Sequence, residues 1–210
     1  MTDKYQDRYL DHQESKKRVL DGDFSSGNKK KITDSFSMIV NRRRSIRAFT
    51  SKVIDGKTLQ KIIEDINNVP SSCNRRAVKM KIISDAHRKE DLDLILRGGN
   101  MWLRKADSVI LFFADMSAYK SPNEVMFMPY LDAGMMMMTA CYSAESQGVG
   151  SCIVNPNMSQ GGELIFREEF NRRGYKLCGA VVLGYSGIKT KPHKNHIKEI
   201  FYEDRNNRKV

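Results

Sequence analysis

Apolar and polar residues alternate along the chain in blocks that have the spacings of helices and strands. Helical spacing predicts one helix after a cap at Ser35, a second over residues 56–66 and a third over residues 85–97. Between the second and third, residues 78–84 alternate apolar with polar side chains, which predicts a strand with one buried face. The first part of the folded body is therefore expected to contain three helices and a strand.

The second half contains two continuous apolar runs, residues 108–114 and 177–185, of the kind found in strands buried on both faces. A helix is expected between them, from Pro129 in its first turn to about Gln147, with Asp132 near the positive end of its dipole. It is apolar nearly all round, and a second copy of the chain is the simplest partner that could bury it. One sheet with helices packed around it follows, an α+β or α/β sandwich. The remaining segments are a strand over residues 151–154 and a helix over residues 164–173.

Length and composition fit one globular domain. The chain has 210 residues, of which 40% are hydrophobic and 29% are charged, and these values exclude a disordered tail. The uncharged, apolar run near the middle, residues 133–144, is too short to span a bilayer, and the N-terminus lacks the apolar region of a signal peptide. We therefore expect a cytoplasmic protein without membrane contact. Residues 1–34 are expected to form a charged helical arm and a linker (residues 21–31), and residues 35–210 the folded domain.

The chain is basic, with a formal net charge of +11 and a pI near 9.5. Nucleic acid, an acidic membrane surface and anionic small molecules are all partners that such a charge allows. The basic residues form separate islands without interleaved aromatic residues, so nucleic acid is the least favoured. The four cysteines form no CxxC pair, and His193 and His196 have no acidic or cysteine neighbour. Neither a disulfide framework nor a metal site is indicated, and buried free thiols are expected.

Four short segments could carry chemistry. Arg43-Arg44-Ser45-Ile46-Arg47 combines guanidinium forks with a hydroxyl, which suits a phosphate group, although a solvated basic face is the ordinary alternative. Residues 70–74 (PSSCN) suit a tight loop with an amide, and residues 148–152 (GVGSC) allow a close backbone approach to a flat ligand. Lysines at 189, 191 and 194 follow the last strand. In isolation, an ordinary turn is the favoured interpretation of residues 70–74, and a plain helix stop explains residues 148–152 equally well. A solvated C-terminal extension is the alternative for the lysines.

In their order and spacing, these segments resemble the motifs of the FMN-dependent nitroreductase family. That family opens with a pattern like RRSxRxF and continues with PSxxN and N-x-W-L-x-x-A. Its central helix normally reads DAG, ends in a GLGSC-like turn, and is followed later by a strand that ends in LGY. The corresponding segments here are residues 43–49, 70–74, 100–106, 132–134, 148–152 and 183–185. The resemblance covers about residues 36–201 and leaves residues 1–34 outside it.

The resemblance implies a fold and a binding site. The fold is expected to be α+β, a three-layer sandwich with a central, mostly antiparallel sheet surrounded by helices and a long central helix at a dimer interface. Members of the family are typically homodimers that bind two FMN molecules between the subunits. By position, the residues matched to the phosphate and ribityl contacts are Arg43, Arg44, Ser45, Arg47 and, from the C-terminal segment, Lys194. Those matched to the region of the flavin ring are Ser72, Asn74, Cys152, Ile153 and Val154.

The activity that the resemblance implies is hydride transfer from NADH or NADPH through FMN to a small acceptor such as a nitroaromatic or a quinone. Three departures from the family pattern surround the ring. Residues 75–78 read RRAV where the family usually has x-Q-P-W, Met138-Thr139 replaces Gln-Asn, and Ser186 replaces a proline. Two alternatives stay open: a flavin-binding protein of the same fold with little reductase activity and, less favoured, a basic nucleic-acid-binding protein.

Overall fold

The computed structural model describes residues 26–96, 101–171 and 173–191. The N-terminal arm (residues 1–25) and Lys194 lie outside the described residues. The helices are α2 (Ser26–Arg42), α3 (Gly56–Asn67), α4 (Ala86–Ile95), α5 (Pro122–Ser146) and α6 (Gln160–Phe170), with short 3-10 turns η1 (Ser72–Asn74), η2 (Leu103–Lys105) and η3 (Met116–Ala118). The strands are β1 (Val78–Ile83), β2 (Ser108–Ala114), β3 (Gly150–Val154) and β4 (Lys176–Gly184).

The strands form one sheet in the order β1-β2-β4-β3, and every neighbouring pair is antiparallel. The two central strands are β2, which is buried along its whole length, and β4, which is buried except at its first residue. This agrees with the two continuous apolar runs of the sequence, because a central strand covered on both faces has no polar side to expose. The register pairs Ile110 with Ile82 on one side and with Val181 on the other.

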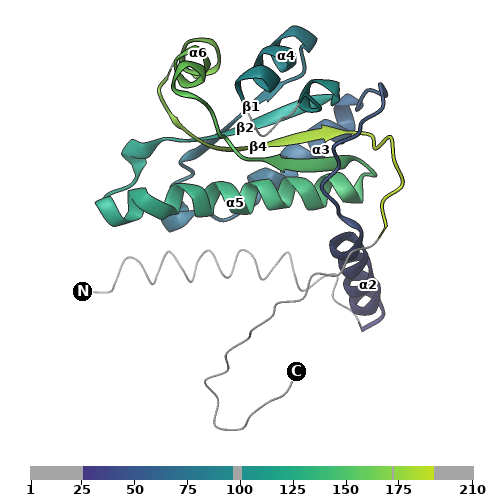
Figure 1. The fold of residues 1–210 in the computed structure, drawn as a ribbon. Coiled ribbons are helices and arrows are strands. Elements are labelled where there is room, and N and C mark those ends of the chain that lie inside the picture. Colours follow the sequence, from purple (N-terminus) through teal and green to yellow (C-terminus); the bar gives the residue numbers. More distant parts are fainter. Residues whose placement is uncertain (1–25, 97–100, 172, 192–210) are drawn as a thin grey trace, which may run out of the picture.

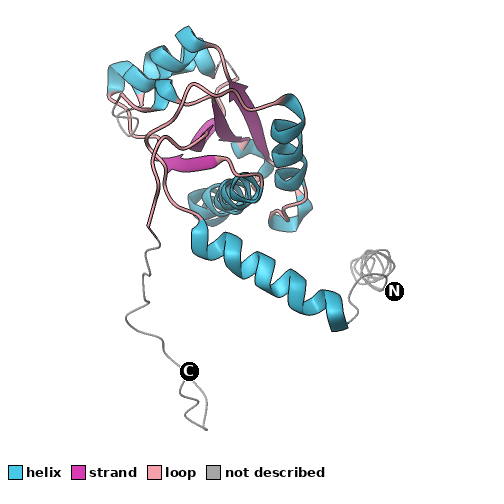
Figure 2. Cartoon of the chain, turned by 90° about the vertical axis from the view of Figure 1, so that its right-hand side faces the viewer, coloured by secondary structure: helices cyan, strands magenta, loops and turns pink. Residues whose placement is uncertain are grey.

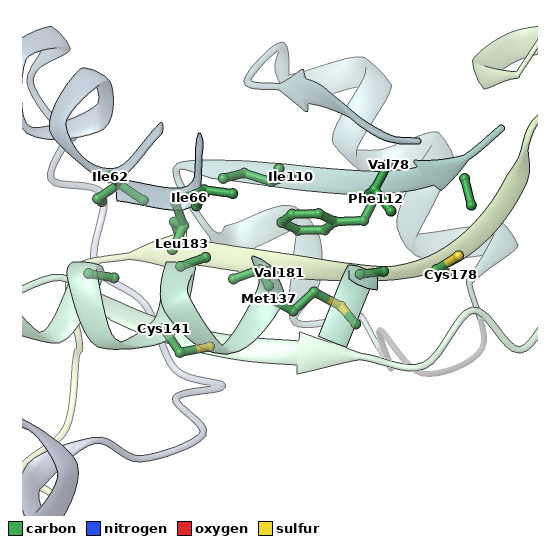
Figure 3. Close-up of a cluster of buried hydrophobic side chains, with 14 of the residues drawn as sticks. Ile62, Ile66, Val78, Ile110, Phe112, Met137, Cys141, Cys178, Val181 and Leu183 are labelled. Carbon is green, nitrogen blue, oxygen red and sulfur yellow. The ribbon is translucent and has the colours of Figure 1, made fainter. Parts of the chain in front are cut away.

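Helices cover both faces of the sheet. Figures 1 and 2 show α3 and α5 on one face and α4 and α6 on the other, which makes three layers. Each face has its own hydrophobic core, and Phe112 lies in the core under α5 while Phe113 lies in the core under α6. In the first of these cores Phe112 sits among residues from two helices, Ile62 and Ile66 of α3 and Met137 of α5 (Figure 3). The α+β three-layer sandwich expected from the sequence is confirmed.

Helix α5 starts earlier than its sequence pattern predicts. It begins at Pro122, and Ser121 caps it by accepting a hydrogen bond from the backbone N–H of Glu124. Pro129 therefore lies inside the helix, where it cannot donate the usual hydrogen bond four residues back. Asp132 is correspondingly far from the first turn, so the prediction that it complements the helix dipole is wrong.

Three other boundaries differ from the prediction. Helix α2 begins at Ser26, so residues 26–31 of the expected linker are helical and Ser35 lies inside the helix that it was expected to cap. The reason is that its lysines are good helix formers despite their like charges. Helix α6 begins at Gln160, where the Ser159 side chain caps it, and it ends at Phe170. Helix α4 ends at Ile95, two residues before the predicted end.

One side of α5 is exposed in a single chain. The exposed side chains are large and apolar, among them Met126, Phe127, Tyr130, Leu131 and Met135. Helix α2 runs away from the body (Figure 2), and it also exposes apolar side chains: Ile32, Phe36, Met38 and Val40. Within the described part of the chain, no helix is long and apolar enough to cross a membrane. The cytoplasmic location inferred from the N-terminus stays a prediction.

Candidate functional site

The basic segment after α2 runs across the ends of β3 and β4. Ser45 forms a parallel bridge with Ser151 of β3, and the backbone N–H of Ile46 donates to the Ser151 carbonyl at 2.9 Å. Further along, Thr50 donates from its backbone N–H to the carbonyl of Tyr185 at 2.9 Å. These pairings hold the segment extended and close to the sheet, so its side chains have defined directions.

Successive side chains of an extended segment point to opposite sides, and this divides the segment into two sets. Arg43, Ser45 and Arg47 form the first set, which faces the thiol of Cys152 on β3. Burial raises the pKa of this thiol, while Arg47, the Ser45 hydroxyl and Arg43 act in the opposite direction. Arg43 also lies close enough to Cys141 of α5 to lower its pKa, which burial raises. Two cations and a hydroxyl are therefore gathered on one side of the segment.

Arg44 and Ile46 form the second set, on the other side. Both line a pocket of about 510 Å³, together with Glu145 at the end of α5 and Lys189 beyond β4. The Arg44 guanidinium donates to the backbone carbonyl of Lys191 at 3.2 Å and to the carbonyl of Arg43 at 2.5 Å. Arg44 thus fastens the C-terminal segment to the basic segment, and it does not share a face with Arg43 and Arg47.

The position of this segment depends on a close approach at Gly150. A Cβ atom at this residue would lie 3.0 Å from the Gly184 carbonyl oxygen and 3.0 Å from Cγ1 of Ile46. A Cβ atom at Gly184 would likewise lie 2.8 Å from Cδ1 of Phe49. The Phe49 ring packs against Trp102 with ring centroids 6.2 Å apart. The same Trp102 ring lies 5.9 Å from the Arg47 guanidinium carbon. The glycines of the GVGSC and LGY motifs therefore serve to bring the basic segment against the sheet.

A second group of candidate residues surrounds η1. Its backbone is unusual, because Cys73, Asn74 and Arg76 all have φ near +50°. Such left-handed conformations are unfavourable for residues other than glycine and cost of order 1–3 kcal/mol each, and they occur often at ligand sites. Asp132 of α5 holds the loop: it accepts a hydrogen bond from the Ser72 backbone N–H at 2.8 Å and another from the Tyr119 hydroxyl at 3.0 Å.

Two arginines fix this loop from either side. Arg75 forms a 2.9 Å ion pair with Glu124 of α5. Arg76 folds back over the C-terminal end of α3 and donates to the carbonyls of Asn67 and Val69 at 2.9 and 2.7 Å. Its Nε also donates to Oδ1 of Asn74 at 3.1 Å. The side chain of Asn74 is consequently oriented by a neighbour, although it is exposed.

The two groups lie beside different parts of α5, one near its middle and the other near its C-terminal end. Ser72 contacts Asp132, whereas Arg42, next to the basic segment, pairs with Glu145 at 3.3 Å. Asp132 and Glu145 are thirteen residues apart, which corresponds to roughly 20 Å of helix. Figure 1 shows α2, which leads into the basic segment, beside only one end of α5. A single chain therefore does not bring the basic set and Asn74 together.

The remaining candidates lie on β3, the edge strand next to the basic segment. The side chains of Cys152 and Val154 are buried, whereas that of Ile153 is exposed. Alternation along the strand puts the backbone N–H and C=O of Ile153 on the same outer edge as the Ser151 carbonyl that Ile46 uses. Of the four thiols expected to be buried, three are, but Cys73 in the left-handed loop is exposed.

Sequence reasoning missed the residues that position the others. Asp132 was recognised as part of a motif but was given the wrong role, since only the fold shows that it holds the loop. Arg76 and Ser151 were not recognised as contributors. The hydrogen bonds from Arg76 to the end of α3 and from Ile46 to Ser151 join segments that the sequence does not link.

Comparison with known proteins identifies a family and relatives of the chain. The model of the nitroreductase family matches residues 40–185. The chain is similar to the FMN reductase [NAD(P)H] of Bacillus subtilis (strain 168), with 29% identity over 153 residues. That match covers 66% of this chain and 61% of the relative, so it spans less than two thirds of the relative's length.

Solved structures show the same fold. An FMN-dependent nitroreductase from Clostridium difficile matches with a TM-score of 0.69 and 22% identity, over 79% of this chain and 98% of that one. A nitroreductase with bound FMN from Desulfitobacterium hafniense matches with a TM-score of 0.65 and 21% identity, over 81% and 98%. Because the family model covers well over half of the sequence, the chain belongs to the nitroreductase family.

Proposed function

We propose that the protein is an FMN-dependent oxidoreductase that takes hydride from NADH or NADPH and reduces a small acceptor such as a nitroaromatic or a quinone. The observation that carries this proposal is the set of Arg43, Ser45 and Arg47 on one side of an extended segment fastened to the sheet. Family membership and the similarity to an FMN reductase support it.

The basic set fits a flavin phosphate. A phosphomonoester carries about 1.5 to 2 negative charges at neutral pH and three strong acceptor oxygens. Two guanidinium groups supply forked donors, and a serine hydroxyl adds a further one. Within the described residues, neither Arg43 nor Arg47 forms an ion pair with a carboxylate. Their charge is therefore available for an anion, and Lys194, outside the described residues, is proposed as a further phosphate contact.

The ring end of the cofactor requires a second subunit. The residues of α5 beside the two groups, Asp132 at Ser72 and Glu145 at Arg42, lie roughly 20 Å apart, farther than the ribityl chain of one FMN reaches. We infer a homodimer in which the basic set of one subunit and Asn74 of the partner subunit contact the same flavin. Ser72 and the outer edge of β3 at residues 152–154 complete the proposed ring contacts.

The exposed apolar residues of α5 and α2 support this dimer. Contiguous exposed apolar side chains on a monomer commonly mark an interface. Met126, Phe127, Tyr130, Leu131 and Met135 lie on the first half of α5, beside Asp132, which supports the loop at Asn74. Pairing two chains along this surface would bury it and would bring the two halves of each site together.

The bound FMN would supply the hydride and electron transfer between nicotinamide and acceptor. The protein's own residues then have three tasks: the basic set binds the phosphate, the loop at Asn74 orients the ring, and β3 supplies backbone along the ring edge. None of these tasks needs a nucleophile or an acid/base pair.

The test is the visible spectrum of the purified dimer. We expect a yellow protein with flavin absorption that is lost when excess NADH or NADPH is added without oxygen, and that returns with an acceptor. A protein that stays colourless after addition of FMN would contradict the proposal.

The departure at residues 75–78, where Arg76, Ala77 and Val78 replace Gln-Pro-Trp, favours a second candidate, a flavin-binding protein with little reductase activity. Flavin that binds but is not reduced by either nicotinamide would favour this candidate.

A further inference from the structure

Arg76 determines which way the Asn74 side-chain amide faces. Its Nε lies 3.1 Å from Oδ1 of Asn74, and an arginine side chain has N–H donors but no acceptor. The amide of Asn74 must therefore present its oxygen to Arg76. Its Nδ2, which carries two N–H donors, lies on the opposite edge of the amide plane.

The guanidinium that imposes this orientation is itself immobilised. One terminal nitrogen donates to two carbonyls at the end of α3, those of Asn67 at 2.9 Å and Val69 at 2.7 Å. The backbone N–H of Arg76 donates to the Ser71 hydroxyl at 3.0 Å. A glutamine, the usual family residue here, has a shorter side chain and a single donor nitrogen. Its two N–H donors are fewer than the three acceptors that the Arg76 side chain contacts, the carbonyls of Asn67 and Val69 and Oδ1 of Asn74.

We propose that Arg76 is a positioning residue that makes Asn74 a hydrogen-bond donor to the flavin ring. The proposal rests on the proposed function, because it concerns the ring contact of the same FMN site. The oxidised ring offers one N–H, at N3, and several acceptors: its two carbonyl oxygens and the ring nitrogens N1 and N5. With its oxygen turned to Arg76, Asn74 contacts one of these acceptors and not N3–H.

The loop conformation is part of this device. Cys73, Asn74 and Arg76 all have φ near +50°, a conformation that needs support from neighbouring contacts. Arg76 supplies that support by joining the loop to α3, while Asp132 joins it to α5. Asn74 is therefore fixed both in position and in the direction of its amide.

The donor assignment is tested with FMN and its 3-methyl analogue as probes, in flavin-fluorescence titrations of the full-length apoprotein. The wild-type protein is expected to bind the two with similar dissociation constants, because N3 has no hydrogen bond from Asn74 to lose. Asn74→Asp keeps the shape but replaces the donor nitrogen with an oxygen. This variant is expected to weaken FMN binding by about tenfold or more, because one hydrogen bond is lost and two acceptors, one on the substituted side chain and one on the ring, then face each other.

Arg76→Ala tests the orienting role. Without the arginine, Asn74 can turn its oxygen toward N3–H, so this variant is expected to bind FMN more tightly than 3-methyl-FMN, by several-fold. A merely structural role would weaken both probes equally and leave their ratio unchanged. Lys79→Ala is the matched control, because it removes a neighbouring exposed cation that donates to the Arg76 backbone carbonyl and leaves the Arg76 guanidinium in place, and its ratio should equal that of the wild type.

Two results would overturn the proposal. The first is a combination of two observations: Asn74→Asp binds FMN as tightly as the wild type, and the wild type does not bind 3-methyl-FMN. Asn74 would then accept a hydrogen bond from N3–H. The second is an unchanged ratio in Arg76→Ala. If Arg76→Ala fails to fold, the wild-type and Asn74→Asp titrations decide the matter alone. A wild-type protein that binds neither probe overturns the proposed function itself, so the two failures are distinguishable.

Discussion

The division of the basic segment into two sides makes a prediction about neighbouring arginines. Arg47→Gln should weaken FMN binding strongly, whereas Arg44→Gln should change it little. Arg47 lies on the side of Cys152 with Arg43 and Ser45, but Arg44 faces the pocket beside Glu145 and donates to the Lys191 and Arg43 carbonyls. Charge and side-chain length are the same in both wild-type residues, so only direction distinguishes them.

The magnitude follows from the bond that is lost. A hydrogen bond to a charged group contributes about 1.5–3 kcal/mol, which corresponds to a roughly 10- to 150-fold change in the dissociation constant. Arg47 is exposed, so its effect is expected near the lower end, about tenfold at physiological ionic strength. For Arg44→Gln we expect a change below about threefold in FMN binding and a lower melting temperature, because the C-terminal segment loses an anchor.

Flavin-fluorescence titration of the apoproteins at fixed salt measures both constants. Arg42→Gln serves as the control for net charge, since Arg42 is an exposed residue paired with Glu145 and belongs to neither predicted contact. Equal losses in Arg44→Gln and Arg47→Gln, or a loss only in Arg44→Gln, would refute the two-sided description of the segment.

Three further predictions concern the surroundings of the site. Gly150→Ala should lower the free energy of unfolding by about 1–3 kcal/mol, and weaken FMN binding, because the new methyl group would displace Ile46; unchanged thermal melting would count against the close approach. The pKa of Glu124 is lowered by the Lys120 backbone N–H and by Arg75, so the stabilising contribution of Glu124 is present above pH 4.5 and is lost as the pH falls through the lowered pKa. The difference in unfolding free energy between wild type and Glu124→Gln should therefore shrink in acid. A difference that does not depend on pH would contradict this. Leu131→Glu places a charge on the exposed face of α5 and should yield monomers in sedimentation analysis, whereas an intact dimer would exclude that face as the interface.

Most of the architecture could be predicted from the sequence because it depends on periodicity. The two apolar runs identified β2 and β4 as central strands, and their burial confirms this. The start of α5 was missed although a signal was present, namely Ser121 followed three residues later by Glu124, the pattern of a capping box. Pro129 was a stronger but misleading signal, because α5 continues through it although a proline removes one helical hydrogen bond.

The site could be predicted only in part, because its organisation depends on contacts between distant segments. Motifs identified the residues of the basic segment and of the loop at Asn74, but not which arginines share a side. That division follows from the pairing of Ser45 with Ser151, which no local pattern reveals. The same holds for Asp132, which contacts Ser72 across sixty residues, and for the left-handed loop that it supports.

The central claim is that each FMN is bound by the basic set of one subunit and Asn74 of the partner subunit, and subunit complementation tests it most directly. Two variants, Arg43→Gln/Arg47→Gln and Asn74→Asp, should each bind FMN poorly as homodimers. In a mixed dimer, one site receives both defects and the other receives none. We predict that titration of the purified mixed dimer finds one FMN site of wild-type affinity per dimer. If both halves of a site came from the same subunit, every site in the mixed dimer would carry one defect, and a mixed dimer without any tight site would contradict the account.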